Sequence, residues 1–344
     1  MQLLGETNSC ESMENIPSLL SVQNLRILFA GPKGFVSAVD NISFDLVKGE
    51  NLAIVGESGC GKTVTSLSIV RLLACPPAKV DGKIFYKNEN LLKKTEAEMR
   101  KIRGKGIAMI FQEPMTSLNP VLTVGRQIME GIRAHQRIGK KEGRELTVEM
   151  LRKVDIPSPE RRINEYPHQL SGGMQQRVMI AIALSCNPEI LIADEPTTAL
   201  DVTIQAQILD LVRQLQDELG TTMILITHNL GVVAELCKKV IVMYAGQIVE
   251  KAFYHSLYSN PAHPYSIRLL DSIPKLDTDQ DELETIEGIV PSLLSMPSGC
   301  RFHPRCLFRK DICTQMLPEL IPLNDNHWVS CWKHCEYKPL RCGM

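Results

Sequence analysis

The sequence NLAIVGESGCGKT at residues 51–63 decides the fold of this chain. A short apolar run, Asn51 to Val55, leads into a glycine-rich loop with the spacing G-x-x-x-x-G-K-[ST], and a helix-compatible segment follows it. Glycines let backbone N–H groups wrap phosphates, the lysine can reach the β- and γ-phosphates, and the threonine hydroxyl can bind Mg²⁺. The pattern predicts a phosphate-binding loop (P-loop) formed by Gly56, Glu57, Ser58, Gly59, Cys60, Gly61, Lys62 and Thr63.

Two adjacent acids follow a second apolar run, Ile190 to Ala193. Strand alternation directs the side chains of Asp194 and Glu195 to different sides. We therefore predict that Asp194 joins Thr63 in binding Mg²⁺ while Glu195 orients the attacking water. Alone, such an acid pair is more often a solvated strand edge, but the P-loop upstream favours the catalytic interpretation.

Composition limits the other classes of function. The 344 residues are 44% hydrophobic and 22% charged, which is ordinary for a globular protein with a main domain and a smaller appendage. With 38 basic and 39 acidic side chains, the net charge of -1 gives no electrostatic case for nucleic-acid binding. No apolar run approaches the roughly 20 residues of a transmembrane helix. We expect a cytosolic protein whose membrane contact comes through partners.

Periodicity predicts an α/β fold around the P-loop. Apolar and polar residues alternate over 22–47, which indicates an antiparallel β region, whereas 51–55, 190–193 and 222–226 are almost wholly apolar, as in buried parallel strands. The expected division is a mobile tail at 1–20, a nucleotide-binding domain at 21–265 with an inserted helical region at about 113–185, and an extension at 266–344. Within it we predict an amphipathic helix capped by Asp201 and a hairpin at 239–250 that turns at Ala245-Gly246.

A P-loop alone also fits kinases, GTPases and helicases, so the deciding element is the segment LSGGMQQR at 170–177. It resembles the signature sequence of ABC ATPases and precedes the acid pair as it does in that family. The resemblance implies a second phosphate cradle that serves the ATP of a facing subunit. It also implies that Gln112 is a switch glutamine at Mg²⁺, that His228 is a switch histidine at the γ-phosphate, and that an aromatic, Phe35 or Phe29, stacks on adenine. The cradle and the dimer-contact loop would use Ser171, Gly172, Gly173, Gln175 and, in the triplet 199–201, Asp201.

Three further segments, 113–120, 166–169 and 260–265, resemble the ATPases of dipeptide and oligopeptide importers. Relatives that import nickel or glutathione share much of this pattern. The resemblance implies a peripheral subunit at the cytoplasmic face of the cell (inner) membrane, in which ATP-driven dimer closure powers uptake of short peptides. Its expected partners are a second, related ATPase subunit in a heterodimer or else a homodimer, two permease subunits and an extracytoplasmic solute-binding protein.

Two other classes compete with a transporter subunit. One is a soluble ABC ATPase of translation or DNA repair, and the other is a metal-sensing regulator with structural ATP. The single P-loop, the single signature and the lack of a heptad run argue against the first. The complete set of catalytic motifs argues against the second.

The 11 cysteines are concentrated in the extension. Four thiolates at Cys300, Cys306, Cys313 and Cys331 suit Zn²⁺ or a [4Fe–4S] cluster, while free structural cysteines are the alternative. Because some importer ATPases resemble iron–sulfur proteins here, the expected cofactors are ATP, Mg²⁺ and a [4Fe–4S] cluster. Separately, the helix N-terminus beside Cys60 predicts a lowered thiol pKa and inactivation by alkylation.

Overall fold

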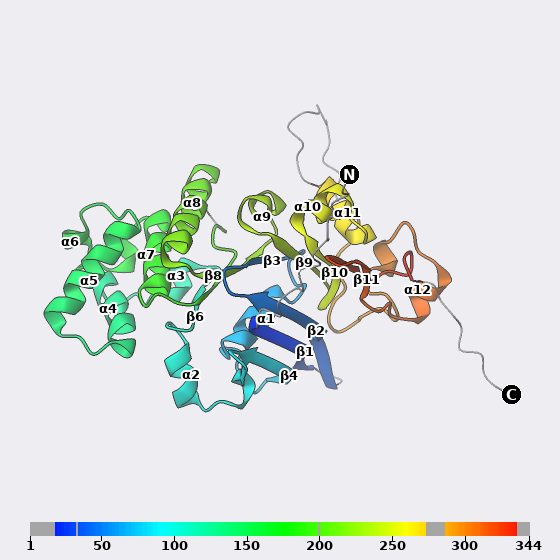
Figure 1. Cartoon of the computed structure of the whole chain (residues 1–344), viewed down its shortest axis with the longest axis horizontal. Helices are drawn as coiled ribbons and strands as arrows, with labels where there is room; N and C mark the ends of the chain where they lie inside the picture. The colour runs from blue at the N-terminus through cyan, green and yellow to red at the C-terminus, as the bar shows by residue number, and fades with distance from the viewer. Residues whose placement is uncertain (1–17, 32–33, 199, 273–285, 336–344) are drawn as a thin grey trace, which may run out of the picture.

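The computed structural model describes residues 18–31, 34–198, 200–272 and 286–335 (Figure 1). Of the tail expected at 1–20, residues 1–17 lie outside the described part, and Ser18 to Leu20 already belong to the first strand. No helix in the described ranges combines the length and apolarity needed to cross a membrane.

The main sheet has eight strands in the order β11-β12-β10-β9-β3-β8-β7-β6. Its centre is parallel, from β9 through β3, β8 and β7 to β6, and the strands beyond β9 are antiparallel. All three strands expected from apolar runs lie in this buried centre, which confirms the prediction. The strands are β3 (Asn51–Val55), β6 (Ile107–Ile110), β7 (Ile190–Asp194), β8 (Thr222–Thr227), β9 (Lys239–Tyr244), β10 (Gln247–Phe253), β11 (Ile321–Asn324) and β12 (His327–Val329).

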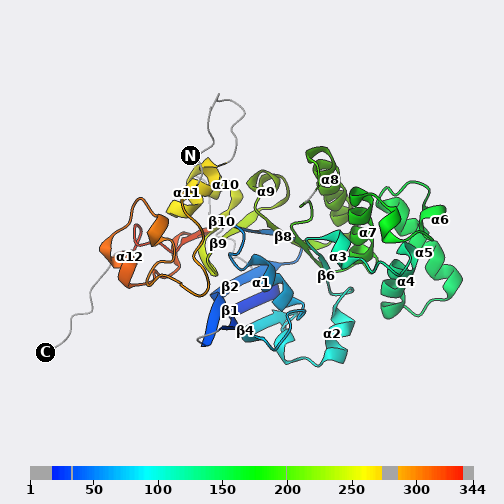
Figure 2. The same ribbon diagram turned by 180° about the vertical axis from the view of Figure 1, so that it is seen from behind.

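A second, antiparallel sheet lies beside the first and has the order β2-β1-β4-β5. The alternation at 22–47 correctly predicts its two long strands, in which buried and exposed residues alternate over part of their length. In Figures 1 and 2 this sheet lies below α1, between the two ends of the molecule. Its strands are β1 (Ser18–Gly31), β2 (Gly34–Val47), β4 (Ala78–Tyr86) and β5 (Glu89–Asn90).

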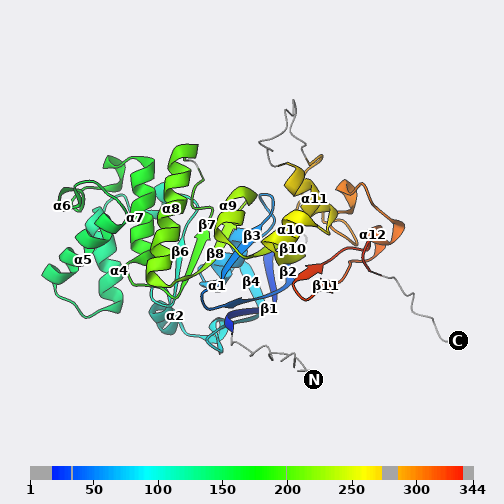
Figure 3. The ribbon, with the colours of Figure 1, turned by 45° about the horizontal axis from the view of Figure 1, so that its top comes forward.

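Helices between β6 and β7 form one end of the molecule, shown in green in Figure 1. The insertion expected at 113–185 is helical throughout most of its length, with α3 (Pro114–Ser117), α4 (Val124–His135), α5 (Lys140–Lys153), α6 (Pro159–Arg162), η2 (Pro167–Gln169) and α7 (Gly172–Leu184). Figure 3 shows α7 and α8 beside β6, β7 and β8. The remaining helices of the main body are α1 (Lys62–Ile69), η1 (Leu91–Lys93), α2 (Glu96–Ile102), α8 (Val202–Leu219), α9 (Leu230–Leu236), α10 (Tyr254–Ser259) and α11 (Pro264–Asp271).

The C-terminal extension lies at the opposite end and continues the main sheet (Figures 1 and 3). Its strand β12 pairs with β10, and the buried His327 Nε2 lies 2.7 Å from Glu250 Oε1 across that junction. The other elements of the extension are η3 (His303–Arg305) and α12 (Asp311–Gln315). The extension is therefore joined to the ATPase core by backbone pairing as well as by side chains.

Candidate active site

The P-loop joins β3 to α1, and its glycines are required by its surroundings. Gly56 has φ 150°, and a Cβ there would lie 2.2 Å from the Met243 carbonyl oxygen. Gly61, with φ 95°, precedes α1, and a Cβ would lie 2.7 Å from the Ala38 carbonyl oxygen. At the crest of the loop, Ser58 and Gly59 are exposed. The close backbone approaches fix the loop against β2 and β9, and its exposed crest is open to a ligand.

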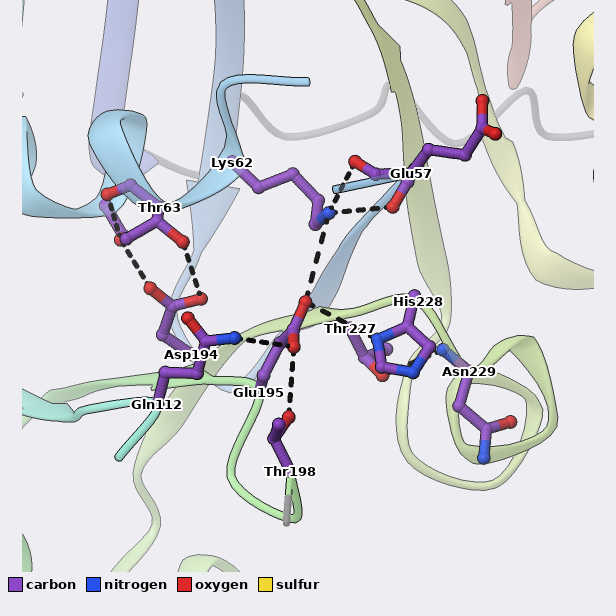
Figure 4. Close-up of polar contacts among 12 residues, drawn as sticks. Glu57, Lys62, Thr63, Gln112, Asp194, Glu195, Thr198, Thr227, His228 and Asn229 are labelled. Carbon is purple, nitrogen blue, oxygen red and sulfur yellow. Dashed lines mark hydrogen bonds and ion pairs between the residues drawn. The ribbon is translucent and has the colours of Figure 1, made fainter. Parts of the chain in front are cut away.

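Lys62 projects from the first turn of α1 into the site (Figure 4). Its Nζ donates to the carbonyl oxygens of Gly56, at 2.7 Å, and Glu57, at 3.0 Å. The same nitrogen lies 4.0 Å from Glu195 Oε1, and the side chain is 5% exposed. The ammonium group of Lys62 is thus held between the P-loop and Glu195, the acid that follows β7.

Asp194 faces two hydroxyls of α1. Thr63 Oγ1 donates to Asp194 Oδ1 at 3.3 Å, and Ser66 Oγ donates to Oδ2 at 3.5 Å. Burial raises the pKa of Asp194 to about 6. A carboxylate beside hydroxyl oxygens is the hard donor set that Mg²⁺ prefers, so these residues fit that ion.

Glu195 is the centre of the polar network in Figure 4. Its Oε2 accepts hydrogen bonds from Gln112 Nε2 and from Thr198 Oγ1, both at 3.0 Å, and its Oε1 lies 3.4 Å from His228 Nδ1. The hydrogen bond with His228 lowers the pKa of Glu195 to about 2 and raises the pKa of His228. Glu195 is therefore a carboxylate at neutral pH, suited to orient a water molecule.

The signature segment lies at the start of α7, next to the start of α8. Ser171 Oγ accepts from Met174 N at 3.4 Å and caps α7. A Cβ on Gly173 would lie 3.1 Å from Ile204 Cγ2, so a larger residue would require the Ile204 side chain to shift. Asp201 caps α8 through Ile204 N at 3.1 Å, whereas Ala199 lies outside the described residues. Within the described ranges, no hydrogen bond or ion pair connects Ser171, Gly172 or Gly173 to the P-loop.

Comparison with known proteins gives consistent results. The family model "ABC transporter" matches residues 39–198. The dipeptide transport ATP-binding protein DppD of Bacillus subtilis is 52% identical over 91% of this chain and 94% of its own. The oligopeptide transport ATP-binding protein AppD of the same organism is 51% identical over 93% and 98%. The chain belongs to the ABC transporter ATP-binding proteins.

Two further comparisons extend this result. A dimeric ATP-binding cassette solved in a post-hydrolysis state with ADP and Pi superposes with a TM-score of 0.62, at 29% identity, over 68% of this chain and 98% of that one. The model "Oligopeptide/dipeptide transporter, C-terminal region" matches residues 249–313. This ABC transporter ATP-binding protein is therefore an ATPase with the extension of the oligopeptide/dipeptide branch.

Two residues expected at the nucleotide lie in different surroundings. Phe35 is 62% exposed at the start of β2, which leaves its ring open for stacking. Gln175 is 6% exposed, and its Nε2 donates to the carbonyl oxygens of Pro167, at 2.9 Å, and Leu170, at 3.2 Å. In this ABC transporter ATP-binding protein, Gln175 holds the segment before the signature instead of facing outward toward a nucleotide.

The expected lowering of the Cys60 pKa is wrong. The sequence predicts a lowered pKa because a helix begins beside this residue, but the side chain is fully buried and burial raises its pKa. Its carbonyl oxygen also accepts from Gly246 N at 3.0 Å, which closes the loop over it. Because the neutral thiol is enclosed, Cys60 is not a reactive cysteine in this conformation.

The expected [4Fe–4S] cluster is also wrong. Among the described residues, no group of three or more His, Cys, Asp or Glu side chains is arranged to hold a metal ion. The four cysteines do line one small cavity, together with Phe302 and Trp332. Burial raises the pKa of Cys300 to about 12 and that of Cys331 to about 11, so these thiols are neutral and pack as small apolar groups. Cys335 is a free thiol, and Cys342 lies outside the described residues.

Sequence reasoning missed two residues of the site. Thr198 donates to Glu195, and its position three residues after that acid is the only signal the sequence offers. The Tyr265 hydroxyl accepts from Glu57 N at 2.8 Å, although the two residues are 208 positions apart. Such a long-range contact has no local sequence pattern.

Proposed function

We propose that this protein energises peptide uptake by hydrolysing ATP at the site around Glu195. The observation that carries the proposal is the convergence of Lys62, Gln112, Thr198 and His228 on that one carboxylate. Lys62 and the loop N–H groups would bind the β- and γ-phosphates, and Glu195 would orient the water for attack. His228 and Gln112 would sense the γ-phosphate through the same carboxylate.

Thr63 and Asp194 would hold Mg²⁺, with Gln112 close to the same edge. The ion would supply charge neutralisation for the departing phosphate when bound. Thr63 and Asp194 orient each other through their hydrogen bond, and Ser66 fixes the second carboxylate oxygen. A bound cation would lower the pKa of Asp194, because positive charge favours the ionised carboxylate.

The signature segment would act on the ATP of a facing subunit. No hydrogen bond or ion pair connects it to the P-loop within the described part of this chain. Ser171 and Gly172 are exposed at the start of α7, and the half-buried Gly173 lies beside α8. Ser171, Gly172, Gly173 and the nearby Asp201 would contact a nucleotide held by the P-loop of the partner, and Phe35 would stack on adenine. ATP then favours the closed dimer, since it contacts both subunits only in that state.

The partner would be a second, related ATPase subunit, with a homodimer as the alternative. Two permease subunits and an extracytoplasmic solute-binding protein would complete an importer at the cytoplasmic face of the membrane. Support for short peptides as cargo comes from the match of residues 249–313 and from relatives named for dipeptides and oligopeptides.

The experiment uses Glu195→Gln in the assembled transporter. Removing the charge while keeping the shape should lower ATP turnover at least about a hundredfold and stop uptake of a labelled dipeptide. ATP binding should remain near the unmodified value because Lys62 and the loop are unchanged. ATPase rate, nucleotide binding and uptake are measured on the same preparation.

Near-normal turnover in Glu195→Gln would remove Glu195 from its catalytic role. Uptake of Ni²⁺ or glutathione in place of dipeptide, with ATPase intact, would change the cargo and leave the ATPase assignment standing. ATPase activity that never depends on permeases would favour the soluble ABC ATPase alternative.

A further inference from the structure

A five-residue segment of the extension, Arg301 to Arg305, reaches the P-loop. The guanidinium of Arg305 forms two parallel hydrogen bonds with the Glu57 carboxylate, NH1 to Oε2 at 2.7 Å and NH2 to Oε1 at 3.1 Å. Its side chain is 5% exposed, whereas that of Glu57 is 29% exposed. This bidentate geometry is the strongest form of an arginine–carboxylate pair.

Other contacts hold the guanidinium in this position. Arg305 Nε donates to the Glu287 carbonyl oxygen at 2.9 Å, and NH2 donates to that of Ile286 at 3.0 Å. NH1 is also 3.3 Å from the Tyr244 hydroxyl. Because partners on three sides orient its planar head, Arg305 reaches Glu57 without a further loss of side-chain freedom.

The rest of the segment anchors the backbone on either side of the P-loop. Arg301 donates to the Ala245 carbonyl oxygen and pairs with Asp40 Oδ2 at 2.6 Å. The Phe302 ring packs against Tyr244, at a centroid distance of 5.1 Å, and against Tyr265, at 5.5 Å. Tyr265 in turn accepts from the Glu57 backbone N–H. Both the backbone and the side chain of Glu57 are therefore held through this one segment.

The negative charge of Glu57 explains why its pairing with Arg305 bears on ATP binding. Glu57 is the second residue of the loop that would receive the phosphates, and its carbonyl oxygen already accepts from Lys62. An unpaired carboxylate there would repel the phosphates of ATP. The bidentate partner neutralises that carboxylate and keeps it turned toward the extension.

We propose that Arg305 is a positioning residue that pairs with Glu57 and thereby makes the ATP affinity of the P-loop depend on the C-terminal extension. The inference rests on the proposed function, since ATP at this loop is the ligand whose binding would be controlled. Arg305 would act on binding, whereas Glu195 acts on hydrolysis. Removal of the arginine should therefore change KM and leave kcat largely unaltered.

The test compares Arg305→Met with the double variant Arg305→Met/Glu57→Gln, measuring MgATP binding and steady-state ATPase in the assembled transporter. The single variant leaves the Glu57 charge unpaired, so Kd and KM for ATP should rise about tenfold or more while kcat changes less than about twofold. The double variant removes that charge as well, so most of the affinity should return. Arg309→Met is the matched control, because Arg309 is an exposed arginine of the same extension, four positions after Arg305.

Three results would overturn the proposal. They are an unchanged KM in Arg305→Met, an equal loss in Arg309→Met, or no recovery in the double variant when thermal melting shows that all variants are folded. Lys62→Ala separates this outcome from failure of the proposed function. ATP binding that survives Lys62→Ala would reject the P-loop assignment itself, whereas its loss together with an unaltered Arg305→Met would reject only the role of Arg305.

Discussion

Glu195 has an unusual backbone conformation, and both oxygens of its carboxylate have polar partners. Its φ of 45° lies in the left-handed region, which a non-glycine residue rarely adopts. The Glu195 N–H donates to the Ile226 carbonyl oxygen at 2.8 Å, so the neighbouring strand β8 stabilises this conformation. The unusual backbone turns the carboxylate away from Asp194 and toward Lys62 and His228. Alternation along a strand predicted the separation of the two acids but not the bend that produces it.

The buried side chain of His263 predicts how the free energy of unfolding depends on pH. Burial, and secondarily the charge of His334, lowers the pKa of His263 to about 3 from an ordinary value near 6.5, and its Nδ1 accepts from Tyr265 N at 3.0 Å. A neutral folded histidine contributes stability above pH 6.5, and this stability is lost as pH falls toward 3 because the unfolded chain binds the proton first. From pH 6.5 to 5 the loss should be roughly 2 kcal/mol.

The measurement is the free energy of unfolding in urea at several pH values. His263→Asn keeps a side-chain acceptor for Tyr265 N and cannot titrate, so its stability should fall less over the same pH range. Equal slopes for the two proteins would show that His263 does not contribute. Glu250, which accepts from His263 N at 2.8 Å, is unchanged in this comparison.

At the level of elements, helix α4 depends on one close approach. The Gly125 N–H donates to the Ile163 carbonyl oxygen at 2.9 Å, and a Cβ on Gly125 would lie 2.0 Å from Ile163 Cγ1. The other glycine of this helix, Gly131, has only an ordinary contact, 3.6 Å to Ser185 Oγ. Gly125 is needed for packing against Ile163, the residue that follows α6, whereas Gly131 has no such constraint.

The two glycines therefore predict opposite effects. Gly125→Ala should lower the free energy of unfolding by about 1–3 kcal/mol, because α4 must move away from Ile163. Gly131→Ala should raise it by about 0.5–1 kcal/mol through helix propensity. Denaturant melts of both variants check this, and a loss of equal size in both would contradict the packing argument.

Local patterns predicted most elements, because burial on both faces or on one face leaves a clear periodicity. The strand at 222–226, the helix after Asp201 and the hairpin turning at Ala245-Gly246 are all present. The P-loop and acid pair were likewise identifiable from spacing. What could not be predicted depends on contacts between distant residues. Burial of Cys60 reversed its expected chemistry, and the pairing of β12 with β10 made the appendage part of the main sheet.

For the whole molecule, the P-loop and the signature segment lie in different parts of the chain. The P-loop lies near the centre of Figure 1, while α7 lies within the helical end. A similar cassette has been solved as a dimer with ADP and Pi. Assembly with a second ATPase subunit would bring the two halves of a nucleotide site together.

This arrangement predicts ATP-dependent association. Glu195→Gln, which should retain ATP, is expected to form a dimer in MgATP after addition of the related subunit and to separate in MgADP, because loss of the γ-phosphate would remove a contact of the proposed interface. Size-exclusion chromatography with light scattering measures the mass. A dimer of this chain alone in MgATP would support the homodimer. The absence of a dimer in MgATP, both with and without the related subunit, would contradict ATP-dependent association.

The pairing of β12 with β10 has a consequence for truncated forms of the protein. Without the extension, β10 would present unpaired N–H and C=O groups at Glu250 to Ala252, and such an open strand edge is a template for intermolecular β-pairing. In the complete sheet the outermost strand of this side is β11, whose Pro322 lacks an N–H donor. The extension thus covers the open edge of β10 and ends this side of the sheet on a strand that is poorly suited to further pairing.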